Sequence, residues 1–78
     1  MLKFNLIEET SKKVVYEYYP EGDKDVGVVS YDKELKTNSI VTLSPKDRHQ
    51  RYAQKLFARL REFSNSNSFE KEGMIAWY

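Results

Sequence analysis

The sequence predicts an α+β fold in which an antiparallel sheet of four to five strands packs one face against a single amphipathic helix. The expected element order is β-β-β-β-α-β. Three observations support this prediction. The first 43 residues form short runs rich in Val and Tyr that turn residues separate. A helical periodicity of apolar residues follows, and the chain closes with an uncharged apolar run.

The first four strands are expected at residues 2–7, 13–19, 26–31 and 38–43. Polar turn segments separate them, and the strongest is Pro20-Glu21-Gly22-Asp23, because Pro fixes φ and Gly tolerates a positive φ. Within the third run, Gly27 indicates either a β-bulge or a close approach of another group to the backbone.

The helix is expected from about Ser44 to Ser64. Ser44 is a suitable N-cap, Pro45 suits the first helical position, and Asp47 stands where a capping-box acid would. A polar segment, residues 64–68, should end the helix. The apolar stripe facing the core comprises Tyr52, Ala53, Leu56, Phe57, Leu60 and Phe63. His49 falls inside this stripe, and we expect the sheet to cover it in part.

The final strand is expected at residues 73–78, where Met-Ile-Ala-Trp-Tyr follows Gly73 without a charge. Such a run fits a strand covered on both faces. Left unpaired it would promote aggregation, so it should pair within the sheet or with another subunit.

With 78 residues, the chain predicts one domain, residues 1–78, with a small core. There is no Cys, which excludes disulfides and Cys-based zinc sites. No apolar run is long enough to span a bilayer, so we expect a cytoplasmic protein without membrane contact. The glycines are isolated and His49 has no evident catalytic partner. We therefore expect neither enzymatic activity nor a cofactor or bound metal.

The net charge of +1 is distributed unevenly. Residues 1–43 hold six Lys against eight acids and sum to −2, whereas residues 44–63 hold six basic residues against two acids and sum to +4. Four of these cations should share one helix flank: Arg48, Arg51, Lys55 and Arg59. They could bind nucleic acid or an acidic partner. Alternatively, they pair internally, through Asp47 with Arg51, Glu62 with Arg59, and acids of residues 17–25.

The aromatic residues supply the leading functional hypothesis. One helix cannot cover both faces of a sheet this rich in Tyr, so some aromatic side chains should form a partner-binding surface. The candidates are Tyr16, Tyr18, Tyr19, Tyr31 and Trp77. We expect a small non-enzymatic protein-interaction module that forms a homodimer. The first alternative is nucleic-acid binding through the basic flank. Another is inhibition of a larger enzyme, with the acidic segment 21–25 imitating phosphate.

Overall fold

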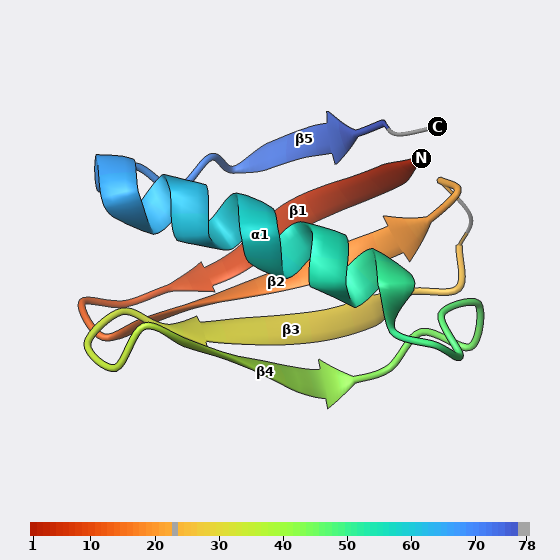
Figure 1. Cartoon of the computed structure of the whole chain (residues 1–78), viewed down its shortest axis with the longest axis horizontal. Coiled ribbons are helices and arrows are strands. Elements are labelled where there is room, and N and C mark those ends of the chain that lie inside the picture. The colour runs from red at the N-terminus through yellow and green to blue at the C-terminus, as the bar shows by residue number, and fades with distance from the viewer. Residues whose placement is uncertain (23, 77–78) are drawn as a thin grey trace.

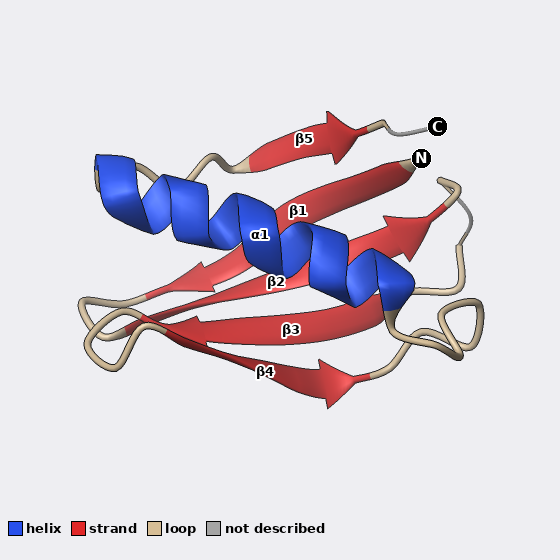
Figure 2. Cartoon of the chain, viewed as in Figure 1, coloured by secondary structure: helices blue, strands red, loops and turns tan. Residues whose placement is uncertain are grey.

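The computed structural model describes residues 1–22 and 24–76, and over these it has one five-stranded antiparallel sheet with one helix across a single face (Figures 1 and 2). The elements are β1 (Leu2–Glu9), β2 (Lys13–Pro20), β3 (Gly27–Asp32), β4 (Thr37–Thr42), α1 (Arg51–Ser66) and β5 (Glu72–Ile75). In space the strands follow the order β4-β3-β2-β1-β5, which makes β4 and β5 the edge strands. The predicted fold class and element order are confirmed.

The core lies between α1 and the sheet face that it covers. Strand alternation sends Phe4, Tyr16 and Tyr18 toward the helix. From the helix come the predicted stripe residues Ala53, Leu56, Phe57, Leu60 and Phe63, all buried. Tyr16 and Tyr18 lie at the centre and are fully buried. Each such side chain stabilises the fold by about 1.5–3 kcal/mol relative to exposure.

The helix begins at Arg51, seven residues later than Ser44, so the predicted start is wrong. The physical reason is that Ser44 is tied to the sheet: its Oγ donates to the carbonyl of Asp25, and its N–H donates to the Tyr18 hydroxyl. The capping acid acts later than predicted, because the Asp47 carboxylate reaches forward to the first turn of α1. Residues 43–50 therefore form an anchored loop before the helix.

Two predictions that depended on the earlier start are also wrong. His49 is exposed in the turn before α1 and lies outside the apolar stripe. Asp47 is buried, and its oxygens accept hydrogen bonds from the backbone and from Tyr18, so it does not serve as the partner of Arg51.

The helix extends two residues past Ser64 and ends in a Schellman arrangement. The N–H of Asn67 donates to the carbonyl of Ser64, and the N–H of Ser68 donates to the carbonyl of Phe63. Asn67 adopts φ 54°, a left-handed conformation that Asn tolerates better than most residues. The polar segment thus ends the helix as expected, although its first residues belong to the last turn.

The final strand is shorter than predicted and stands at the edge of the sheet. β5 pairs with β1 inside the sheet, with Ile75 on the covered face and Met74 on the open face. The expectation that both faces are covered is wrong, because Met74 is about half exposed. Trp77 and Tyr78 lie outside the described residues.

Gly27 has the second of its two predicted roles, because another group lies close to its backbone. A Cβ at Gly27 would lie 2.2 Å from Cε1 of Tyr18, so the tyrosine ring occupies that space. The bulges lie elsewhere: β1 has a register shift at Ile7, and β4 has one at Val41. The bulge at Val41 bends the outer edge of the sheet.

Candidate protein-interaction surface

The edge strand β4 presents an uncharged backbone edge to its surroundings. Residues 37–45 contain no charged side chain. Val41 is 61% exposed and Leu43 is 37% exposed, while Leu35 in the preceding turn is 73% exposed. Edge strands are usually protected by charged residues, proline or short length. β4 has a bulge but neither a charge nor a proline, so its outer N–H and C=O groups can pair with another strand.

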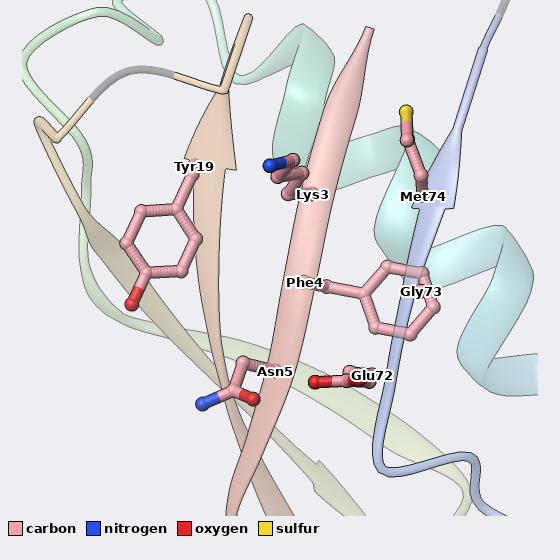
Figure 3. Close-up of a pocket in the computed structure, with 7 residues that line it drawn as sticks. All are labelled: Lys3, Phe4, Asn5, Tyr19, Glu72, Gly73 and Met74. Atoms are coloured by element: carbon pink, nitrogen blue, oxygen red, sulfur yellow. The ribbon is translucent and has the colours of Figure 1, made fainter.

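The open face of the sheet holds a shallow hollow of about 610 Å³ across β2, β1 and β5 (Figure 3). The strand register sets Tyr19, Lys3 and Met74 side by side in one row across it. The Tyr19 hydroxyl donates to the Glu17 carboxylate at 3.0 Å. Burial, followed by this hydrogen bond, raises the pKa of Tyr19. The hollow therefore combines aliphatic and aromatic contact area with charges of both signs.

The five residues predicted to bind a partner are separated by the fold. Tyr16, Tyr18 and Tyr31 come together in the core, where no partner reaches them in the folded chain. Tyr19 lies on the open face and is partly exposed. Trp77 is outside the described residues. Both faces of the second predicted strand carry tyrosines, so periodicity alone did not indicate which face the helix covers.

The buried carboxylate of Asp47 organises the loop before the helix. Its Oδ1 accepts the N–H of Tyr52 at 3.0 Å, and its Oδ2 accepts the N–H of Ala53 at 2.9 Å and the Tyr18 hydroxyl at 3.1 Å. Burial raises the pKa of the Tyr18 phenol to about 12, the N–H of Ser44 opposes the shift, and the Asp47 carboxylate adds to it. An internal carboxylate thus satisfies amides that the helix N-terminus leaves free.

The predicted basic flank is not a single helical ridge. Arg48 lies in the turn before α1, and Arg51 is its first residue; both are exposed. Arg59 forms the predicted ion pair with Glu62, at 3.9 Å. Lys55 also has an interaction partner. Part of the flank is therefore engaged with other residues of the chain.

Glu21 connects the acidic loop to the helix. Its Oε2 accepts the Tyr52 hydroxyl at 2.6 Å and the ammonium of Met1 at 2.7 Å. The hydrogen bond from this ammonium, and then that from Tyr52, lowers the pKa of Glu21. One acid of residues 17–25 therefore contacts the helix, but its partners are Tyr52 and the N-terminal ammonium and not the helix cations that the internal-pairing alternative names.

Sequence reasoning missed the β4 edge as a candidate site. The signal was present as nine consecutive uncharged residues, but strand order decides whether such a run is central or at an edge. Over residues 1–22 and 24–76, no helix has the length and apolar character that a bilayer crossing requires. The chain matches no protein-family model, no curated protein and no solved structure at a significant level of similarity.

Proposed function

We propose that this chain is a non-enzymatic protein-interaction module that binds by strand addition at β4. In this mode an extended segment joins the edge of a sheet, main-chain hydrogen bonds provide the attraction, and alternate side chains provide selectivity. The observation that carries the proposal is the uncharged β4 edge, with exposed Val41 and Leu43 beside unpaired backbone groups.

The arrangement of the core supports this choice of surface. Tyr16, Tyr18 and Tyr31 are committed to packing under α1. Ser44 and Asp47, the buried polar residues of the described chain, are committed to anchoring the loop before the helix. The β4 edge is held in place by these contacts and remains open on its outer side.

A peptide titration tests the proposal. A synthetic peptide of alternating Val and Thr, unrelated to the sequence of this chain, serves as a strand-forming probe and is added to ¹⁵N-labelled protein. We expect amide shift changes concentrated in β4 and β3, with β5 unaffected. A Val41→Lys variant of the protein should bind this peptide at least about tenfold more weakly, because a lysine on an edge opposes pairing. Shift changes confined to the open face, or none at all, would contradict the proposal.

Nucleic-acid binding is the second candidate function, and one observation favours it. Arg48, His49 and Arg51 line a hollow of about 240 Å³ before the helix, and Asp47, which also lines it, directs its carboxylate to the backbone amides of Tyr52 and Ala53. The local surface is therefore more basic than the sequence of this segment suggests.

The test is fluorescence anisotropy with a labelled single-stranded oligonucleotide at low and moderate salt. Binding through this surface should weaken steeply with salt. It should be lost in Arg48→Glu with Arg51→Glu and retained in the matched Arg61→Glu variant, since Arg61 lies on the helix away from the hollow. Equal losses in both variants would indicate nonspecific attraction and contradict a site here.

A further inference from the structure

We infer that the strand received by β4 is β4 of a second copy of this chain, paired antiparallel about a two-fold axis at Ser39. The inference rests on the proposed function, because it requires β4 to be the contact edge. The described parts of the two copies would then form one continuous ten-stranded sheet, five strands from each.

The charge distribution favours pairing of β4 with itself. A two-fold interface places a surface against its own copy, so each charge near the axis would meet a like charge. Residues 37–45 contribute no charge to such a contact. The charge nearest to this segment on its N-terminal side is Lys36, which lies in the turn before β4 with a positive φ and so stands outside the paired residues. The other edge strand, β5, begins with Glu72 and follows Glu70 and Lys71.

The faces of β4 restrict the register. The pairing with β3 places Asn38 and Ile40 on the helix side, and Thr37 and Ser39 on the open side. Residues directly opposite in an antiparallel pair share a face, so the axis must pass through a residue position rather than between two. Three centres remain within the regular part of β4: Asn38, Ser39 and Ile40.

The surroundings of Ile40 and Val41 distinguish these centres. With the axis at Ser39, Asn38 pairs with the partner's Ile40 on the helix side, and the bulge residue Val41 lies next to the partner's Thr37. The exposed side chain of Val41 thus gains a neighbour. An axis at Asn38 would instead set Ile40 opposite Lys36, which lies in the turn outside β4, and an axis at Ile40 would pair Ser39 with the bulge residue.

The helix position permits this assembly. A two-fold axis perpendicular to the sheet keeps both helices on the same face. Figure 1 shows α1 lying over β1 and β2, with β4 at the margin beyond it. The two helices would therefore stand apart on the joined sheet. An edge contact of this length falls in the range of small interfaces, so we expect a dissociation constant on the order of micromolar or weaker.

Single cysteines test the register, and the natural chain has no cysteine to interfere. With the axis at Ser39, the two copies of Ser39→Cys face each other with Cα atoms about 4.5–5.5 Å apart, within disulfide range. Mild oxidation should therefore convert this variant into a covalent dimer. Thr37→Cys is the matched control, because its two copies would lie about 13 Å apart along the strands. A mixture of Thr37→Cys with Val41→Cys should cross-link into the mixed dimer.

Sedimentation equilibrium of the wild-type chain completes the experiment. A concentration-dependent dimer, together with rapid cross-linking of Ser39→Cys alone, is the expected result. Equal cross-linking rates for Ser39→Cys and Thr37→Cys would overturn the register and the two-fold at Ser39. A monomer up to about millimolar concentration would overturn self-pairing. In that case, binding of the unrelated Val-Thr peptide at β4 would leave the proposed function standing, and its failure to bind would remove both.

Discussion

The two edge strands of the sheet differ in how they meet their surroundings. β5 has four residues, begins with an acid and follows a lysine and another acid. It is also packed closely inward, since a Cβ at Gly73 would lie 2.7 Å from Cζ of Phe4. β4 has six residues, carries no charge and leaves Val41 largely exposed.

This contrast indicates a division of roles between the edges. Short length and charge are the usual protections of a sheet edge, and β5 has both. β4 has a bulge and no charge, yet the loop that follows it is firmly anchored through Ser44 and Asp47. An open edge on a well-held strand is suited to receive another strand.

The largest effect is expected from removing the anchor on the β4 side. Asp47→Ala would leave the amides of Tyr52 and Ala53 and the hydroxyl of Tyr18 without their acceptor. Loss of a cap together with buried unpaired groups should lower the free energy of unfolding by about 2–4 kcal/mol. Urea denaturation measures it, with exposed Arg48→Ala as the control. A change below about 0.5 kcal/mol would mean that the carboxylate is not the anchor.

The next effect tests the inward packing of β5. Gly73→Ala places a methyl group against the Phe4 ring, and we expect a loss of about 1–3 kcal/mol from overpacking. In a thermal scan, each kcal/mol corresponds to roughly 4–8 °C in a domain of this size. The neighbouring Met74→Ala variant, on the open face, should change the midpoint little. Adding Phe4→Leu should restore part of the loss, and the absence of any restoration would argue against a direct clash.

Alkaline pH tests the buried tyrosines of β2, which lies between the two edge strands. The pKa of Tyr18 is about 12 in the folded chain against an ordinary 10.0, and burial raises the pKa of Tyr16 as well. The folded state therefore keeps protons that the unfolded state loses. This contribution to stability is intact below about pH 10 and disappears as the pH rises to about 12.

The expected loss by pH 12 is on the order of 2–3 kcal/mol from Tyr18 alone, because each pKa unit corresponds to about 1.4 kcal/mol. Urea unfolding at successive pH values measures it, and the slope should be smaller in Tyr18→Phe. Stability that stays level between pH 10 and 12 would contradict the buried state of these phenols.

The smallest effect on stability is expected at the open edge itself. Val41→Lys should change the free energy of unfolding by less than about 0.5 kcal/mol, because the side chain is largely exposed. Its effect should instead appear in association, which we expect to weaken by at least about tenfold in sedimentation. Met74→Lys on the β5 side is the matched control and should leave association unchanged. The reverse pattern would assign the contact to the β5 side.

Most of the fold could be predicted from local patterns. Alternation in the strands and the stripe from Ala53 to Phe63 depend on periodicity alone, and the structure confirms both. The helix start could not be predicted in this way. Ser44 and Pro45 are favourable as a local cap, but contacts of Ser44 with Asp25 and Tyr18, distant in sequence, hold that segment against the sheet.

The candidate surface depended even more on distant contacts. The choice of which tyrosines are buried follows from which sheet face α1 covers, and the sequence carries tyrosines on both faces of β2. β4 is an edge strand because of the strand order: β5 joins the sheet beside β1, at the opposite side, and not beside β4. Neither the burial of particular tyrosines nor the edge position of β4 can be predicted from the residues of a single strand.

Hydrogen exchange as a function of protein concentration tests the central claim most directly. At low concentration, the outward-facing amides of β4 should exchange rapidly. At high concentration, where copies associate, these amides should become protected while those of β5 keep their rates. Protection that grows in β5 or on the open face, with β4 amides unchanged, would contradict the account of β4 as the contact edge.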